Sequence, residues 1–289
     1  MSSDLIDLHI HTSVSDGTYS PTEIVHLAQT QGLKAISITD HDTIKGNEEA
    51  IKVGMERGLE VIPGVEISVE WNKCPIHIIG YFVNWQSQSL AVELQNLVEY
   101  REERNCKIIS KLHSLGLDIS YDEVKMIAGD GTIGRPHFAQ VLIKKAYAKN
   151  EDEAFKKYLQ RGAPAHVDKK RLNPQEGIHL IKNAGGIAIL AHPFTTEEIK
   201  DNEMEQFILH FKRLGIEGVE VFYPIHTPQQ TFTLRAITEK YGLLMTGGSD
   251  FHGEQKPTMF LGRGFGNMYV HYELIENMKK KLRTGKELD

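Results

Sequence analysis

The chain has 289 residues, enough for one large α/β domain or for one domain that carries an insertion. Its hydrophobic content of 40% and charged content of 25% are those of an ordinary globular protein. Its net charge of −6 argues against electrostatic binding of nucleic acid by a broad basic surface. Two cysteines are too few for a disulfide framework or a thiolate zinc site, and no apolar stretch approaches the ~20 residues that span a bilayer. We therefore expect a cytoplasmic protein that does not enter the membrane.

Strand-like apolar runs alternate with helix-like segments in both outer parts of the chain, which is typical of βα units. A Trp71-Asn72-Lys73 turn joins two of the runs without a helix between them, and Ser20 and Pro21 form a helix start. Strands are predicted over 5–11, 34–39, 59–68, 75–83, 186–191, 216–223 and 243–247, and helices over 21–31, 46–57, 174–184, 196–214 and 228–241. Seven strands with helices outside them indicate a barrel-like sheet, in which function gathers at the carboxyl ends of the strands.

Residues 89–168 interrupt this alternation. Leucine and isoleucine recur at helical spacing over 89–115, and further helices are predicted over 121–128, 136–149 and 152–160. We interpret 89–168 as a helical insertion, a substrate cap beside the strand ends of a barrel formed by 1–88 and 169–289. A second helical domain with only a stabilising role is the alternative.

Histidine and carboxylate side chains follow or interrupt nearly every predicted strand. His9 and His11 are two residues apart on one strand and therefore share a face, and Asp250 and His252 repeat this spacing. Glu66 stands among apolar neighbours, where an unpaired carboxylate is strongly disfavoured. His77 alternates with isoleucines and by itself fits a buried core histidine. Imidazole plus carboxylate is the ligand set of zinc, manganese or iron, and the candidate metal ligands are His9, His11, Asp16, His41, Glu66, His77, His192, Asp250 and His252.

These motifs resemble those of the PHP family, the polymerase and histidinol phosphatase metallohydrolases. The resemblance rests on His9-Ile10-His11, Thr39-Asp40-His41-Asp42, Gly64-Val65-Glu66, Ala191-His192-Pro193 and Ser249-Asp250-Phe251-His252. It implies an α/β fold, a distorted seven-stranded (βα) TIM-like barrel with a helical insertion, and a trinuclear centre of divalent metal ions, manganese, iron or zinc. It also implies three ligand sets: His9, His11, Glu66 and Asp250 for one metal; Glu66, His77 and His192 for a second; Asp16, His41 and His252 for the third.

The run GDGTIGRPH, from Gly129 to His137, is similar to one branch of the family, whose members act on nucleoside 3′,5′-bisphosphates or degrade short RNA from the 5′ end. Pro136 favours a helix start here, so Arg135 would sit at an anion-friendly helix N-terminus, with His137 donating a further bond to phosphate. A solvated arginine on a capped helix is the alternative. His226 follows another strand end and is a further candidate for phosphate contact. A basic rim from Arg101, Arg104, Lys169, Lys170 and Arg171 is a weaker hypothesis, since charge runs are usually solvated faces.

Three divalent cations would bring a positive charge twice as large as the negative charge of the carboxylates of Asp16, Glu66 and Asp250. The excess positive charge favours binding of a phosphate dianion and of an attacking hydroxide. Water bound to a metal can lose its proton near pH ~7, so the expected nucleophile is a metal-bound hydroxide and no protein nucleophile is needed.

The leading hypothesis is a phosphatase that removes the 3′-phosphate of nucleoside 3′,5′-bisphosphates and leaves a 5′-mononucleotide. A 5′-3′ exonuclease on short RNA or DNA is the first alternative, followed by a histidinol-phosphate phosphatase, an amidohydrolase and a non-catalytic, metal-stabilised binding module. The expected partners are a phosphorylated nucleotide or a short oligonucleotide, and no protein partner is predicted.

Overall fold

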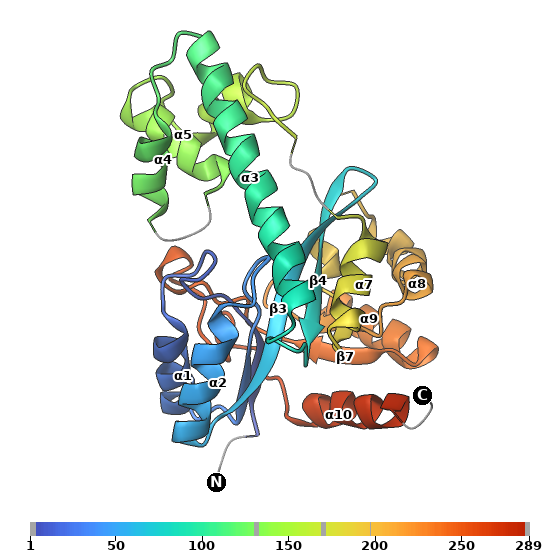
Figure 1. Ribbon diagram of the computed structural model, residues 1–289. Helices are drawn as coiled ribbons and strands as arrows, with labels where there is room; N and C mark the ends of the chain where they lie inside the picture. Colours follow the sequence, from blue (N-terminus) through green and yellow to red (C-terminus); the bar gives the residue numbers. More distant parts are fainter. Residues whose placement is uncertain (1–3, 130–132, 169–171, 197, 287–289) are drawn as a thin grey trace. The chain divides into compact units, whose positions relative to one another are not determined.

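The computed structural model describes residues 4–129, 133–168, 172–196 and 198–286 (Figure 1). The chain forms two compact units. The barrel unit comprises Met1–Val92 and Leu172–Asp289, and the insertion unit comprises Glu93–Arg171. Of the helices that the described residues form, none is long and apolar enough to cross a membrane.

The barrel unit is built on a curled sheet of seven strands that follow one another in chain order. The strands are β1 (Ile6–Ile10), β2 (Ala35–Ile38), β3 (Glu60–Trp71), β4 (Cys74–Tyr81), β5 (Ile187–Leu190), β6 (Gly218–Phe222) and β7 (Leu244–Gly247). A bridge between Ile10 and Phe251 joins the end of β1 to the segment after β7. This architecture confirms the expected α/β fold with a distorted seven-stranded barrel.

The direction of β4 sets it apart from the other strands. β1, β2 and β3 pair in parallel, as do β5, β6 and β7, whereas β4 runs antiparallel to both of its neighbours. The predicted turn after Trp71 is confirmed: Asn72 and Lys73 adopt left-handed φ angles of 49° and 70°, and Trp71 pairs with Cys74. Such a two-residue turn matches the twist of the strands and reverses the chain without a helix.

Within the described residues, the helices that accompany the sheet are α1 (Pro21–Thr30), α2 (Gly46–Arg57), α7 (Pro174–Asn183), α8 (Met204–Leu214), α9 (Pro228–Tyr241) and α10 (Glu273–Lys286). Ser20 caps α1 through a capping box, as its sequence predicts. The helix expected over 196–214 begins only at Met204, because the buried apolar face of α8 starts there, and short 3₁₀ turns at Pro193–Thr195 and Asp201–Glu203 precede it. Helix α10 was not predicted.

Besides the buried apolar residues that join the sheet to α1 and α2, the barrel unit has a core inside the curled sheet. Ile6, Leu8, Ile79 and Ile189 are fully buried there and pack with Met278 of α10. Helix α10 therefore contributes to the core beneath the strands, and Figure 1 shows it across the end of the sheet where β1 begins.

The insertion unit has its own apolar core. Its helices are α3 (Gln88–Ser114), whose first residues belong to the barrel unit, α4 (Tyr121–Ala128), α5 (Arg135–Lys144) and α6 (Glu151–Ala154), followed by a π-helical turn at Phe155–Leu159. Ile108, Phe138 and Leu142 are fully buried in this core. The helix expected over 136–149 ends at Lys144, because Ala146 turns the chain with a φ of 58°. That the insertion is a substrate cap stays a prediction.

Candidate metal centre

The candidate ligands of the barrel unit lie at one edge of the sheet. His9 lies in β1, and His11, His41, His192 and Asp250 follow β1, β2, β5 and β7. His77 lies in the first half of β4 rather than after a strand, and it pairs with Ser68 of β3. Because β4 is antiparallel, its first half lies at the edge where the parallel strands end. The fold thereby brings His77 to the other candidate ligands, although its local sequence pattern is that of a buried core histidine.

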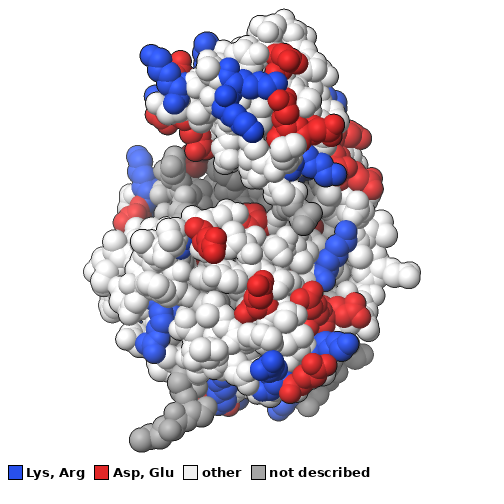
Figure 2. All heavy atoms as spheres, turned by 90° about the vertical axis from the view of Figure 1, so that its left-hand side faces the viewer, with Lys and Arg blue, Asp and Glu red and all other residues white. Residues whose placement is uncertain are grey.

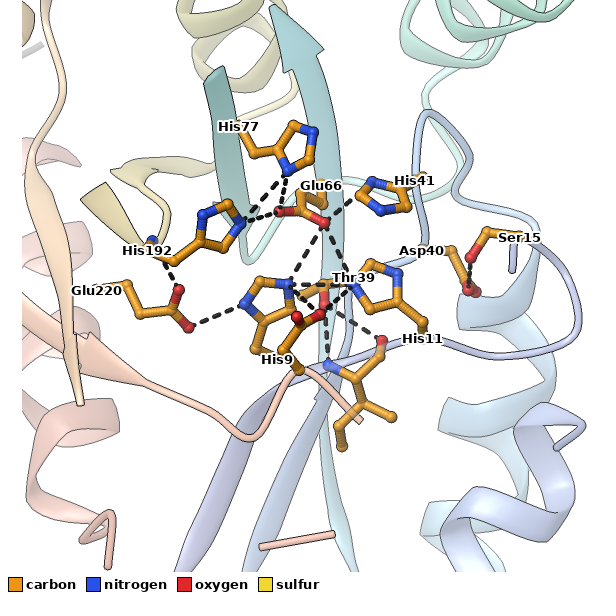
Figure 3. A network of polar contacts seen from close by, with 12 residues as sticks. His9, His11, Ser15, Thr39, Asp40, His41, Glu66, His77, His192 and Glu220 are labelled. Carbon is orange, nitrogen blue, oxygen red and sulfur yellow. Dashed lines mark hydrogen bonds and ion pairs between the residues drawn. The ribbon is translucent and has the colours of Figure 1, made fainter. Parts of the chain in front are cut away.

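Glu66 occupies the centre of this group (Figure 3). It is 1% exposed, and its two oxygens face different imidazoles. Oε1 lies 3.0 Å from His77 Nδ1 and 3.1 Å from His192 Nε2. Oε2 lies 3.0 Å from His41 Nδ1, 3.2 Å from His11 Nε2 and 3.4 Å from His9 Nε2. One carboxylate thus stands between two sets of nitrogen donors, the position of a bridging ligand.

Two more carboxylates complete the arrangement. Asp250 Oδ1 lies 3.2 Å from His11 Nε2 and 3.6 Å from His9 Nε2. Asp16 lies in the loop after β1, with 3.5 Å between its Oδ1 and both His11 Nδ1 and His252 Nε2. Four sets of donors lie close enough to share an ion: His9, His11 and Asp250; His9, Glu66 and His192; His41, Glu66 and His77; and His11, Asp16, His41 and His252. All nine candidate ligands belong to at least one set.

The donor atoms themselves fit divalent cations. His11 Nδ1, His41 Nδ1 and Glu66 Oε2 are buried and make no hydrogen bond to any described residue, although His41 Nδ1 lies 3.0 Å from Glu66 Oε2 and His11 Nδ1 lies 3.5 Å from Asp16 Oδ1. Buried polar atoms without partners are disfavoured, and converging nitrogen and carboxylate lone pairs are what zinc, manganese or iron bind.

The carboxylates of the cluster are charged and His41 is neutral, as metal ligands must be, whereas in spite of their burial His9, His11 and His192 have a pKa raised by the neighbouring carboxylates. Burial alone would raise the pKa of Glu66, but His77, His41 and His9 hold it well below its ordinary value. Burial lowers the pKa of His41 to about 3 against the attraction of Glu66, which keeps this imidazole neutral and able to donate a lone pair. The pKa of Asp16 is lowered in spite of its burial, by its bond to His252 and by the nearby His41 and His11.

Buried carboxylates that were not among the predicted ligands hold the ligand segments in place. Asp40 accepts hydrogen bonds from Thr12 N and Thr12 Oγ1, both at 2.7 Å, and from Ser15 Oγ at 2.6 Å. These bonds fix the loop that carries Asp16. At Gly17 a Cβ atom would lie 2.3 Å from His11 O, so only glycine fits this tight return of the loop.

The sequence patterns also did not predict a role for Glu220 of β6 or the side chains that contact Asp250. Glu220 is fully buried and contacts His9 and His192 (Figure 3). Its sequence signal is the one that identified Glu66, a carboxylate within an apolar strand. Asp250 Oδ2 accepts from Tyr223 Oη at 2.8 Å and from Lys256 Nζ at 2.9 Å. Tyr223 follows β6 and Asp250 follows β7, 27 residues further along the chain, so no spacing within the sequence connects these two side chains.

The residues predicted to bind substrate make internal contacts in this structure. Arg135 begins α5, and its Nη1 lies 3.3 Å from Leu159 O and 3.2 Å from His166 Nδ1. His137 Nδ1 accepts from Gly134 N at 3.0 Å and so caps the same helix. The predicted helix N-terminus is thus present.

His226, in the barrel unit, directs one nitrogen to the backbone and leaves the other unsatisfied. Its Nδ1 lies 3.1 Å from Val221 O, whereas its Nε2 is buried without a hydrogen bond among the described residues. Burial lowers the pKa of His226, which favours the neutral ring.

The two arginines of the expected basic rim that the structure describes are buried. Arg101 and Arg104 of α3 are 7% and 6% exposed, and Arg104 Nη2 donates to Asn105 Oδ1 at 2.7 Å, so neither lies on a solvated face. Lys169, Lys170 and Arg171 lie outside the described residues. Figure 2 shows acidic and basic side chains interspersed on one face of each unit, in keeping with the net charge of −6.

Known proteins are similar to this chain in sequence and in fold. The model of the PHP domain matches residues 7–159. A 5′-3′ exoribonuclease of Haemophilus influenzae is 37% identical over 85% of this chain and 89% of its own length, and a 3′,5′-nucleoside bisphosphate phosphatase of Chromobacterium violaceum is 32% identical over 86% and 87%. The crystal structure of a Bifidobacterium adolescentis protein, assigned as a metal-dependent phosphoesterase, superposes with a TM-score of 0.78 at 27% identity over 96% of both chains. The chain therefore belongs to the PHP domain family.

Proposed function

We propose that this metal-dependent phosphoesterase removes the 3′-phosphate of nucleoside 3′,5′-bisphosphates and releases a 5′-mononucleotide. The observation that carries the proposal is Glu66, whose two oxygens separate two sets of imidazoles in a buried cluster. The similarity to the Chromobacterium violaceum phosphatase supports the choice of substrate.

Nine residues would hold the ions. His9, His11, Glu66 and Asp250 form the first proposed site, Glu66, His77 and His192 the second, and Asp16, His41 and His252 the third. The distances support two parts of this division: Asp16 lies near His41 and His252, and Glu66 Oε1 faces His77 and His192. We propose three manganese, iron or zinc ions per chain. When bound, such ions supply a Lewis acid that activates water as the nucleophile and polarises the phosphate.

The residues of the chain then have three tasks. Six neutral imidazoles and three carboxylates leave the loaded centre with excess positive charge, which draws a phosphate dianion to it. The buried ring of His226, with its lowered pKa, offers Nε2 as a contact for substrate. The burial of His9, His11 and Glu66 keeps bulk water from the donor atoms, and this strengthens each electrostatic contact.

The insertion unit would select the substrate. Arg135 and His137 lie in the first turn of α5, where the helix dipole favours an anion. We propose that they bind the 5′-phosphate, leaving the 3′-phosphate for the metal centre. The insertion therefore sets specificity and the barrel performs hydrolysis.

A second candidate is the removal of nucleotides from the 5′ end of short RNA. The 37% identity to the Haemophilus influenzae exoribonuclease favours it. Both activities use the same elements, because a 5′-phosphate bound at one position presents the next 3′-linked phosphate for cleavage in either substrate.

One experiment separates these candidates. Purified protein is loaded with manganese and incubated with adenosine 3′,5′-bisphosphate, with adenosine 3′-monophosphate and with a 5′-phosphorylated RNA pentamer, and phosphate and mononucleotides are measured. The proposal expects rapid formation of adenosine 5′-monophosphate from the bisphosphate, slower turnover of the monophosphate, and no activity after chelation. Faster release of mononucleotides from the RNA favours the exonuclease. Undiminished activity in the presence of chelator would contradict both candidates.

A further inference from the structure

We infer that Glu220 is a positioning residue that orients two of the proposed metal ligands, His9 and His192, with a single carboxylate. The inference rests on the metal centre proposed above. It adds a residue that would bind no ion and yet links two of the three sites, from the side opposite to Glu66 (Figure 3).

Both oxygens of Glu220 are used. The residue lies in β6 and is fully buried, and its Oε1 lies 2.9 Å from His9 Nδ1. Its Oε2 accepts a hydrogen bond of 2.9 Å from the backbone N–H of His192. The two contacts reach β1 on one side and the segment after β5 on the other, so one side chain spans three elements of the barrel.

The contact with His9 determines which ring nitrogen can bind a metal. A carboxylate oxygen accepts, so the proton of the His9 ring belongs on Nδ1. The lone pair then lies on Nε2, which faces Glu66 Oε2 at 3.4 Å and Asp250 Oδ1 at 3.6 Å. Carboxylates that bind the second nitrogen of a ligand histidine fix its tautomer and ring orientation in this way.

The contact with His192 holds an unusual backbone. His192 has a φ of 24° and a ψ of 58°, a region that residues other than glycine rarely adopt unless their surroundings impose it. The hydrogen bond from its N–H to Glu220 is one such constraint. This backbone directs the ring so that Nε2 lies 3.1 Å from Glu66 Oε1, while Nδ1 lies 2.9 Å from Thr195 Oγ1.

Only a carboxylate can serve both partners. His9 Nδ1–H and His192 N–H are two donors, and each requires an acceptor. Glutamine has the same size but only one acceptor oxygen, so its amide group would direct an N–H towards one of the two donors. Glu220→Gln therefore removes one of the two contacts with almost no change in volume.

The test uses the full chain, with zinc as the probe. Parent protein, Glu220→Gln and a control, Glu60→Gln, are stripped of metal, and their circular dichroism and thermal unfolding are recorded. Glu60 is a suitable control because it also lies in the sheet, at the start of β3, and its partners are Lys279 and Tyr272 rather than a candidate ligand. Zinc stoichiometry and affinity are then measured by competition with a chromophoric chelator.

We expect Glu220→Gln to bind zinc about 10- to 100-fold more weakly than the parent, with unchanged circular dichroism, and Glu60→Gln to bind like the parent. Parent-like zinc affinity in Glu220→Gln, with or without a lower unfolding temperature, would overturn the inference and leave Glu220 as a packing residue. A parent that binds no zinc would overturn the metal centre itself, which is a distinct outcome.

A second measurement does not depend on the folding of the variant. In the zinc-loaded parent, histidine ring ¹⁵N spectra should show His9 protonated at Nδ1, with slow exchange of that proton with solvent. A His9 ring protonated at Nε2, or an Nδ1 proton that exchanges freely, would overturn the role of Glu220 even if Glu220→Gln failed to fold.

Discussion

Replacement of Glu66 by glutamine is the most direct test of the metal centre. The change retains the shape of the side chain but removes a buried negative charge that faces five imidazoles within 3.4 Å. Loss of one partner from a buried, compensated charge cluster costs about 3–5 kcal/mol. Since about 1.4 kcal/mol corresponds to a factor of ten, the affinity for metal should fall by roughly 10²- to 10⁴-fold.

The number of ions lost distinguishes a bridging ligand from an ordinary one. We expect elemental analysis after dialysis against micromolar manganese to show that Glu66→Gln loses two ions per chain. The matched variant Asp16→Asn should lose one, because the candidate ligands that Asp16 contacts among the described residues are His11, His41 and His252, and Asp16 does not stand between two sets of imidazoles as Glu66 does. If the two variants lose the same number of ions, or if Glu66→Gln retains the metal content of the parent, the bridging role argued from the geometry is wrong.

Three further predictions concern the rest of the chain. Gly248→Ala should destabilise the protein by about 1–3 kcal/mol or more in chemical denaturation, because its Cβ would lie 2.2 Å from His9 N; an unchanged midpoint would contradict this close approach. Arg135→Ala should lower kcat/KM by roughly 30- to 1000-fold for substrates with a 5′-phosphate but hardly change hydrolysis of a phosphodiester without one, and an equal loss for both would assign Arg135 a structural or catalytic role. Lys145 holds the pKa of Glu123 at about 2, below its ordinary value of 4.5, so this carboxylate stabilises the fold above pH 4.5 and the contribution disappears as the pH falls towards 2. Glu123→Gln should therefore be less stable than the parent at pH 7, by less than about 1 kcal/mol, and equally stable near pH 2 in thermal unfolding.

Local sequence patterns determined the strands and most of the candidate ligands. Short apolar runs, bounded by turn residues, placed all seven strands to within a few residues, because strands that are buried on both faces need continuous apolar runs. Polar side chains within such runs, such as Glu66, stood out because burying them without a partner is unfavourable. Helix starts with strong caps, such as Ser20 before α1, were predicted correctly for the same local reason.

Other features depended on which distant segments meet. The local pattern around His77 is that of a core histidine, and only the antiparallel register of β4 brings its ring to Glu66. Glu220 carries the same signal as Glu66, but its partners are 211 and 28 residues away along the chain. Hydrophobic periodicity reports how deeply a side chain is buried and on which face it lies. The pairing of strands far apart in the chain decides which buried polar groups come into contact. Only the tertiary structure therefore distinguishes a proposed metal ligand, such as His9, from the residue that would position it, such as Glu220.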